Sequence, residues 1–388
     1  MYIRNHPRTM EILKIEDFIK QFHKKNENMT FTEFKNSGKV KIGEKMRPLK
    51  EYVLEKKIEN QDLKLLFENI KTRDEYLTRF YNLSLRIQPD KIHINIPPMK
   101  RNHMNNNHET MFKNIIRNIH YKGILLETES GIENNPTYMK MLLDLYLRNI
   151  IDYKLLTPSA IFYMKSGRLG SVFSSYYFRA SIMNPYLVYS INKSILHGTR
   201  IFTPTLGWSS YCYGFLECPE VVEYVGTDVI QDVCSKTEQL CKSHINRVKY
   251  DIFCKPSEDL LKTKSFIDKY KNHFDVVFFS PPYYKLELYK GGKQSTDRYN
   301  TYEEWLENYW LATIQLCHRV LEKGGRLCYI LSDYGSQTTK NHFELLSDMN
   351  NITKKYFHLK NIQPMFNKNV NVTSHRDTNE KIMIFEKK

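Results

Sequence analysis

The sequence predicts an α/β fold preceded by a mainly helical domain. From about residue 160 onward, short apolar runs with strand-like composition alternate with segments of helical periodicity. This alternation is typical of an α/β sheet. In the first 90 residues the apolar positions follow a helical spacing more often than an alternating one. We therefore expect a mainly helical, basic domain over residues 1–155 and an α/β domain over residues 160–388.

The composition excludes several classes of protein. Of 388 residues, 41% are hydrophobic and 26% charged, which is typical of a soluble globular chain. No apolar run reaches the 18 residues that suggest a membrane helix, and the first residues lack the apolar segment of a secretory signal. The seven cysteines form no CxxC pair and the 13 histidines no HxxxH pair, so we expect neither a metal site nor disulfides. The expected location is the cytoplasm or nucleus.

The charge of the chain favours a polyanionic partner. The net charge is +15 and the pI is near 9.2. Residues 1–170 hold 30 Lys and Arg against 20 Asp and Glu, whereas residues 171–388 hold 28 against 23. An AT-rich coding sequence would raise the lysine content everywhere, and the basic stretch at residues 35–50 could be a solvated surface. A compositional bias does not predict the asymmetry, however.

The expected elements of the α/β part are short strands and the helices between them. A helix over about residues 302–321, followed by Gly324-Gly325, separates the fourth strand from the fifth. The expected strands lie near residues 200–203, 222–227, 249–254, 274–279, 326–332 and 380–386.

Three segments with unusual chemistry come directly after expected strands. They are TPTLGWSSY at 203–211, the end of YVGTD at Asp228, and SPPY at 280–283. Ligands of open α/β sheets bind beyond the carboxyl ends of the strands, so we expect the three segments to meet at one crevice. Asp228 comes 21 residues after Gly207, and this spacing fits a carboxylate that binds a nucleotide ribose. An aspartate at this place is also a common helix N-cap.

The SPPY segment forms a corner at the end of an apolar strand. Pro281 and Pro282 exclude both a helix and a ladder hydrogen bond, so the chain must leave regular structure there. A proline-rich loop after a buried strand is the plain alternative.

With these residues the sequence resembles the S-adenosylmethionine-dependent methyltransferases that modify exocyclic amino groups in nucleic acids, the N6-adenine and N4-cytosine family. Their catalytic corner is Asp, Asn or Ser, then Pro-Pro and an aromatic residue, and residues 280–283 match it at all four places. A subset of phage and large-virus methylases is more similar still, with Asp-Pro-x-x-Gly-Trp-Gly-Gly-Arg before a Gly-x-Asp strand. The residues in register with that pattern are Pro204, Gly207, Trp208, Gly226 and Asp228.

The resemblance covers about residues 170–388. It implies a Rossmann-like seven-stranded methyltransferase sheet, S-adenosyl-L-methionine as the cofactor, and a viral or phage origin. It also implies further cofactor contacts: Asp228 to the ribose hydroxyls, Asp259 to the adenine, and Asn184-Pro185 in a segment that covers the cofactor.

The chemistry that the corner must perform agrees with its residues. An exocyclic base amine is a poor nucleophile because its lone pair is conjugated with the ring. Ser280 Oγ and the Pro281 carbonyl could accept its two N–H groups and so favour a reactive, pyramidal nitrogen. Tyr283 would stack on the flipped base, which is worth about 1–3 kcal/mol.

The first segment departs from the family pattern. Thr203 stands where the family has Asp, and Ser209, Ser210 and Tyr211 stand where it has Gly, Gly and Arg. Serine can still donate hydrogen bonds to the methionine part of the cofactor. Without the carboxylate, we expect weaker binding of the cofactor's ammonium group, and a catalytically inactive relative is an alternative.

The sequence therefore predicts a site-specific DNA methyltransferase that uses base flipping. Serine in the first corner position is commonest among cytosine-N4 enzymes, whereas the order of the two motifs is commonest among adenine-N6 enzymes; we favour adenine slightly. An RNA base amino-methyltransferase and a non-catalytic nucleic-acid-binding subunit are the alternatives. In each case the expected partner is nucleic acid, and the expected role of the basic N-terminal domain is to bind phosphates and to contact the target sequence.

Overall fold

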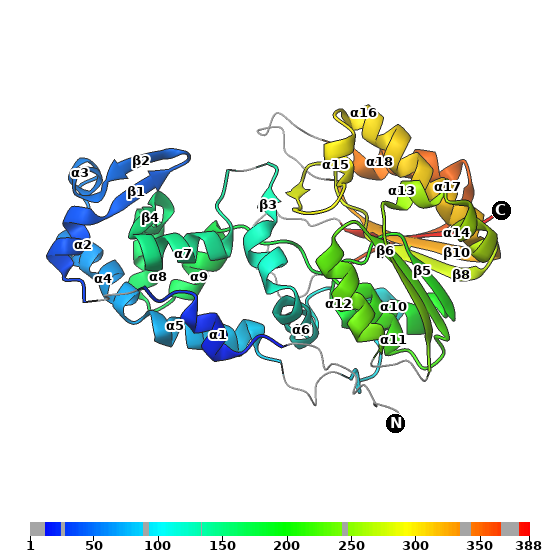
Figure 1. Cartoon of the computed structure of the whole chain (residues 1–388), viewed down its shortest axis with the longest axis horizontal. Helices are drawn as coiled ribbons and strands as arrows, with labels where there is room; N and C mark the ends of the chain where they lie inside the picture. Colours follow the sequence, from blue (N-terminus) through cyan, green and yellow to red (C-terminus); the bar gives the residue numbers. More distant parts are fainter. Residues whose placement is uncertain are drawn as a thin grey trace, which may run out of the picture. The chain divides into compact units, whose positions relative to one another are not determined.

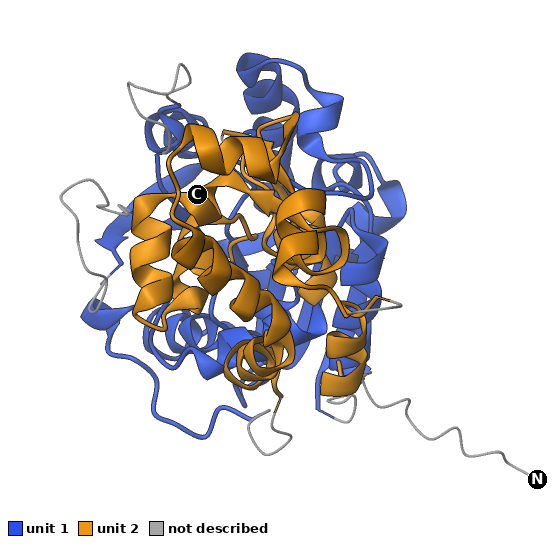
Figure 2. Cartoon of the chain, turned by 90° about the vertical axis from the view of Figure 1, so that its left-hand side faces the viewer, with its two compact units in different colours: residues 1–11, 88–120, 182–388 blue, residues 12–87, 121–181 orange. Residues whose placement is uncertain are grey.

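The computed structural model of the chain describes residues 12–24, 28–87, 93–132, 134–242, 247–333, 343–365 and 380–388. The chain divides into two compact units (Figure 2). The first, the sheet unit, comprises residues 1–11, 88–120 and 182–388, and the second, the helical unit, comprises residues 12–87 and 121–181.

This division differs from the boundary predicted near residues 155–160. Residues 88–120 belong to the sheet unit, although they come early in the chain. The side chain of Asn184 explains part of this assignment, because its Nδ2 donates to the carbonyl of His108 at 2.6 Å. Its backbone N–H donates to Asn106 Oδ1 at 2.7 Å. These contacts hold the loop at 105–109 on the start of a helix of the sheet unit.

The sheet unit is built on a seven-stranded sheet with the order β11-β12-β10-β8-β5-β6-β7. Only β12 is antiparallel to its neighbours, β10 and β11. The predicted Rossmann-like α/β fold is therefore confirmed. The strands are β5 (Arg200–Thr203), β6 (Glu223–Asp228), β7 (Lys249–Cys254), β8 (Phe274–Phe279), β10 (Leu321–Leu331), β11 (Phe357–Pro364) and β12 (Lys381–Lys387).

The strand order places the ends of β5 and β8 side by side. From β5 the chain runs outward through β6 and β7, and then returns to β8 on the other side of β5. All these strands are parallel, so their carboxyl ends share one edge of the sheet. This reversal of the strand order is where open α/β sheets bind their ligands.

Helices cover both faces of this sheet. In Figure 1, α10 to α12 lie on one side, and α13, α14, α17 and α18 lie on the other. Apolar side chains of the central strands, such as Phe202, Val277 and Phe278, are fully buried between the layers. The helices and remaining elements of the unit are η3 (Arg101–His103), α6 (Met111–Ile119), α10 (Pro185–Ile191), η6 (Asn192–Leu196), α11 (Ser210–Leu216), α12 (Gln231–Lys242), α13 (Ser257–Leu260), α14 (Lys264–Tyr270), β9 (Glu287–Leu288), α15 (Ser295–Arg298), α16 (Tyr302–Trp305), η7 (Leu306–Trp310), α17 (Leu311–Val320) and α18 (Leu345–Lys354).

The helical unit contains helices and a small three-stranded sheet of order β2-β1-β4. Three of its α-helices, α2, α7 and α8, begin at a threonine that caps the helix. Thr30 and Glu33 form a capping box, and Thr157 caps a helix that has Pro158 in its first turn. The elements are α1 (Ile15–Lys20), α2 (Phe31–Ser37), β1 (Lys39–Ile42), β2 (Lys45–Pro48), α3 (Leu49–Glu55), α4 (Asn60–Lys71), α5 (Arg73–Phe80), η1 (Tyr81–Leu85), η4 (Gly123–Glu127), β3 (Glu129–Ser130), α7 (Tyr138–Arg148), β4 (Ile150–Asp152), η5 (Tyr153–Leu156), α8 (Pro158–Lys165) and α9 (Leu169–Tyr176).

Among the described helices, none combines the length and the apolar composition needed to cross a membrane.

Candidate active site

The predicted catalytic corner follows β8 without an intervening residue. Ser280 is half-buried and Pro281 is buried. Ser280 Oγ donates its hydrogen to the carbonyl of Ile330 in β10 at 3.1 Å. A hydroxyl has one hydrogen and two lone pairs, so this bond leaves the oxygen free to accept hydrogen bonds. No described residue donates a hydrogen bond to the Pro281 carbonyl, which is therefore a second available acceptor.

The aromatic residue of the corner is held through its hydroxyl group. The backbone N–H of Ser332, just beyond β10, donates to Tyr283 Oη at 2.9 Å. Burial, together with the charge of Glu380, raises the pKa of Tyr283, so the phenol is neutral at physiological pH. One end of the half-buried ring is thus fixed to the sheet, as a stacking platform requires.

The turn after β5 contains three consecutive residues in the left-handed region. The φ angles are 52° at Gly207, 56° at Trp208 and 65° at Ser209. For residues other than glycine this conformation costs roughly 1–2 kcal/mol each, and such backbone strain is concentrated at functional sites. In one turn of helix the N–H groups point the same way, and none of these three donates to another described residue. The turn, which we call the left-handed turn, therefore presents a set of donors suited to a carboxylate.

Tyr211 joins this turn to the catalytic corner. Its hydroxyl accepts the backbone N–H of Ser280 at 3.1 Å and donates to the Ser280 carbonyl at 3.3 Å. Its ring lies over Gly207, where a Cβ would come within 2.2 Å of Tyr211 Cζ. Glycine is therefore needed at position 207 for its positive φ and also for the space that Tyr211 occupies.

Thr203 and Gly226 are paired in register between β5 and β6. The fully buried hydroxyl of Thr203 is hydrogen-bonded to Tyr224 Oη at 2.7 Å. A Cβ at Gly226 would approach Leu206 Cδ2 to 2.4 Å. Both residues thus pack the turn against the sheet, and the Thr203 hydroxyl points to a core partner.

Asp228 ends β6 and binds backbone groups on two sides. Its Oδ2 accepts the N–H of Leu206 at 3.1 Å, and its Oδ1 accepts the N–H groups of Val229 at 2.8 Å and Ile230 at 3.1 Å. Burial raises the pKa of Asp228, while these hydrogen bonds oppose the increase. A carboxylate has about four acceptor positions, so one remains for a ligand hydroxyl.

Residues 274–388 match the family model N6_N4_Mtase, described as DNA methylase. This segment is of the DNA methylase family. The predicted family is thus confirmed from β8, which carries the corner, to the last strand. The matched segment does not include the left-handed turn or Asp228.

Solved structures of methyltransferases also resemble the chain, at low similarity. TrmN from Thermus thermophilus shows 12% identity over 53% of this chain and 49% of its own, with a TM-score of 0.35. A putative rRNA methylase from Clostridium thermocellum shows 14% identity over 50% of this chain and 93% of its own, with a TM-score of 0.33. The chain thus spans about half the length of TrmN. Among curated proteins, none matches the sequence.

Asp259 has a partner that the sequence did not suggest. Arg298 in α15 donates to Asp259 Oδ1 at 2.9 Å and to Glu258 Oε1 at 2.7 Å. The Glu258 side chain is only 5% exposed, and burial raises its pKa. The two carboxylates therefore anchor α15, and an adenine would have to share Asp259 with Arg298.

Asn184 and Pro185 form the start of α10. Asn184 Oδ1 caps the helix by accepting the N–H of Tyr186, and Pro185 occupies the first turn. Asn184 is fully buried, and its other polar groups bind the loop at 105–109. The structure therefore gives this pair a capping and loop-anchoring role.

Some contacts of the site carry no signal in the sequence. Ser280 and Tyr211 are 69 positions apart, and His120, which contacts the left-handed turn, lies still further upstream. Only the folded chain brings them together. No group of three or more potential metal ligands occurs in the described part of the chain.

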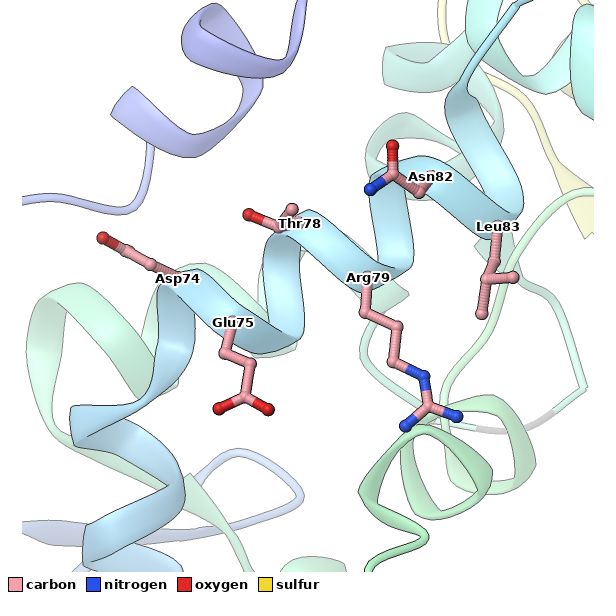
Figure 3. Close-up of a pocket in the computed structure, with 6 residues that line it drawn as sticks. All are labelled: Asp74, Glu75, Thr78, Arg79, Asn82 and Leu83. Carbon is pink, nitrogen blue, oxygen red and sulfur yellow. The ribbon is translucent and has the colours of Figure 1, made fainter.

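A pocket of about 620 Å³ lies in the helical unit, on α5 and η1 (Figure 3). None of the predicted site residues lines it. Its carboxylates, Asp74 and Glu75, disfavour a phosphate. The lining residues are Asp74, Glu75, Thr78, Arg79, Asn82 and Leu83.

Proposed function

We propose that this methyltransferase transfers a methyl group to the exocyclic amino group of a base in DNA, with N6 of adenine favoured over N4 of cytosine. The observation that carries the proposal is the hydrogen bond from Ser280 Oγ to the Ile330 carbonyl. Because the Ser280 hydroxyl gives its only hydrogen to this bond, its oxygen can act only as an acceptor toward a ligand. An amino group needs such an acceptor for its N–H. The order of the two motifs along the chain favours adenine.

The corner would act on the amine through two acceptors. Ser280 Oγ and the Pro281 carbonyl would each accept one N–H, so that the nitrogen lone pair is directed away from the ring. Tyr283, fixed at Ser332, would stack on the extruded base. As the new N–C bond forms and the C–S bond of the donor breaks, the amine loses one proton to solvent.

S-adenosylmethionine supplies an activated methyl group on a sulfonium. The residues present fit this group in part. The free N–H groups of the left-handed turn suit its carboxylate, and the remaining acceptor position of Asp228 suits a ribose hydroxyl. Thr203 offers no contact for its ammonium group, because the Thr203 hydroxyl is bound in the core.

The experiment that tests the activity is methyl transfer from labelled donor to mixed DNA and RNA, followed by digestion to nucleosides. Labelled N6-methyladenine from DNA is the expected product. N4-methylcytosine would correct the base, label in RNA alone would favour the RNA alternative, and no label with retained DNA binding would favour the non-catalytic one. Ser280→Ala and Tyr283→Ala should each abolish most of the label. Matched controls are Ser235→Ala and Tyr356→Ala, two half-buried side chains of the same unit.

The helical unit would bind the phosphate backbone through its β1–β2 hairpin. Lys39 and Lys45 on this hairpin and Lys50 just after it are exposed, whereas Arg47 is paired with Glu55 at 2.5 Å. A variant that binds one phosphate fewer should show a slope of log K against log salt that is smaller by about 0.9. Replacing the three lysines by Gln should therefore reduce the slope by about 2 to 3. The control replaces three exposed lysines of the sheet unit, Lys262, Lys264 and Lys323.

A further inference from the structure

The left-handed turn needs support that a turn with the glycines of the family pattern would not need. The resembling methylases have glycine at the position of Ser209, and glycine adopts a positive φ without strain. Here Ser209 has a φ of 65° and is buried, with 1% exposure. Trp208 before it has a φ of 56° and 9% exposure. Strain of this kind persists only where the surroundings hold it.

A chain of three buried side chains holds Ser209. His120 Nε2 lies 2.9 Å from Ser209 Oγ, which lies 2.7 Å from Thr237 Oγ1. His120 and Thr237 are 1% and 0% exposed. They come from two separate helices, since His120 directly follows α6 and Thr237 lies within α12.

The direction of each hydrogen bond in this chain can be deduced. Thr237 Oγ1 donates its only hydrogen to the carbonyl of Val233 at 2.7 Å, so it accepts the hydrogen of Ser209. Ser209 has then given its own hydrogen, so its oxygen accepts from His120 Nε2–H. Nδ1 is buried and has no partner among the described residues. A second proton there would be a buried donor without an acceptor, so the ring holds its single proton on Nε2. Burial, with the charge of Lys236, lowers the pKa of His120 and agrees with a neutral ring.

The imidazole also contacts the second strained residue. The ring centroids of His120 and Trp208 are 5.7 Å apart, and Tyr289 lies 6.0 Å from Trp208 on an edge-on approach. One side chain thus touches both strained residues of the turn, through a hydrogen bond to Ser209 and ring packing on Trp208.

We propose that His120 is a positioning residue for the methyl donor: through its Nε2–H bond to Ser209 and its packing on Trp208, it holds the left-handed turn in the conformation that binds the donor. The proposal rests on the proposed function for the identity of the ligand. It explains how Ser209 can keep a positive φ at a position where the family pattern has glycine.

The test is a cycle of full-length variants. His120→Leu removes the N–H that binds Ser209, His120→Gln restores an N–H at the place of Nε2, and Ser209→Gly removes the backbone strain at position 209. Donor affinity is measured by calorimetry with S-adenosylmethionine. We expect His120→Leu to bind at least about tenfold more weakly than the wild type and His120→Gln to bind within about threefold of it. The loss of affinity caused by His120→Leu should be smaller in the Ser209→Gly background than in the wild type.

A second readout separates this proposal from the proposed function. The chain has three tryptophans, so 5-fluorotryptophan labelling gives three ¹⁹F resonances, and Trp208→Phe assigns one of them. His120→Leu should split the Trp208 resonance or shift it strongly, and His120→Gln should shift it less and leave it unsplit. If the wild type fails to bind the donor, the proposed function is wrong, while the resonance still decides whether His120 holds the turn.

The proposal is overturned if His120→Leu leaves both the affinity and the resonance unchanged, or if its effect is equally large in the Ser209→Gly background. Should His120→Leu fail to fold, Thr237→Val replaces it, because this change removes the acceptor of the Ser209 hydrogen and leaves the ring intact. Its effect should likewise be smaller beside Ser209→Gly.

Discussion

The hydroxyl of Tyr211 is bound to both backbone polar groups of Ser280, accepting its N–H at 3.1 Å and donating to its carbonyl at 3.3 Å. These bonds connect the first turn of α11, which follows the left-handed turn, to the catalytic corner. In the family pattern an arginine stands at this position, so the link is a feature of this chain. The ring is fixed by Phe278, whose centroid is 5.4 Å away at an interplanar angle of 86°.

Tyr211→Phe should slow methyl transfer more than it weakens donor binding. The substitution removes two hydrogen bonds, worth about 0.5–1.5 kcal/mol each, and retains the ring. We expect the single-turnover rate to fall about tenfold, equivalent to about 1.4 kcal/mol in the barrier, with the donor affinity changed less than about threefold. Tyr356→Phe, which also loses a side-chain hydrogen bond, serves as the control. An unchanged rate would show that the corner keeps its position without the link.

Gly207→Ala should be more damaging than alanine at another glycine with positive φ. A Cβ at position 207 would meet Tyr211 Cζ at 2.2 Å, whereas at Gly43, with a φ of 60°, it would meet nothing within 4 Å. Gly43→Ala should therefore lower the free energy of unfolding by about 1 kcal/mol through backbone strain alone. Gly207→Ala should cost at least about 2 kcal/mol, since overpacking adds typically 1–3 kcal/mol. Urea unfolding of both variants measures the difference, and equal losses would contradict the clash.

How much of this structure the sequence predicts depends on whether the residues that interact are near or distant in the sequence. The strands at 200–203, 249–254 and 274–279 have the predicted bounds. The pattern is clearest for β8, a buried parallel strand that is a nearly continuous apolar run. The edge strand β11 was not predicted, since its buried and exposed residues alternate and half its side chains are polar. Partners such as Arg298 for Asp259 depend on how distant elements meet, which no local pattern encodes.

The same limit applies to the division into units. Charge and periodicity indicated two parts but could not reveal that residues 88–120 pack with the sheet. The corner itself was predictable because two prolines after a buried strand impose a conformation by themselves.

Arg298→Leu should destabilise the sheet unit by leaving a buried carboxylate without its cation. Hydrogen bonds to charged groups contribute about 1.5–3 kcal/mol, and Glu258 and Asp259 would each lose one. We expect the free energy of unfolding to fall by about 2 kcal/mol. Burial already raises the pKa of Glu258, and losing Arg298 should raise it further. The loss should therefore be largest at neutral pH and shrink as Glu258 is protonated in acid.

Glu258→Gln in the Arg298→Leu background tests this explanation. The amide has no charge to bury, so the double variant should recover part of the lost stability and lose the added pH dependence. Thermal unfolding at several pH values measures both effects. A double variant no more stable than Arg298→Leu would mean that the charge of Glu258 is not the cause.

The stability of the protein should contain a pH-dependent contribution from His120. Burial, with the charge of Lys236, lowers the pKa of His120 well below its ordinary value of 6.5. Below about pH 6.5, His120 then binds a proton in the unfolded chain and stays neutral in the folded chain. The folded state therefore loses stability as the pH falls through this range. Above pH 7 both states are neutral at His120 and the contribution is constant.

His120→Gln should remove that contribution and keep the hydrogen bond to Ser209. The difference in unfolding free energy between the variant and the wild type should therefore shift in favour of the variant as the pH falls from 7 to 5, approaching about 1.4 kcal/mol per pH unit at most. Urea unfolding across this range measures the difference. A difference that does not vary with pH would show that His120 titrates alike in both states, which contradicts burial of the ring in its neutral form.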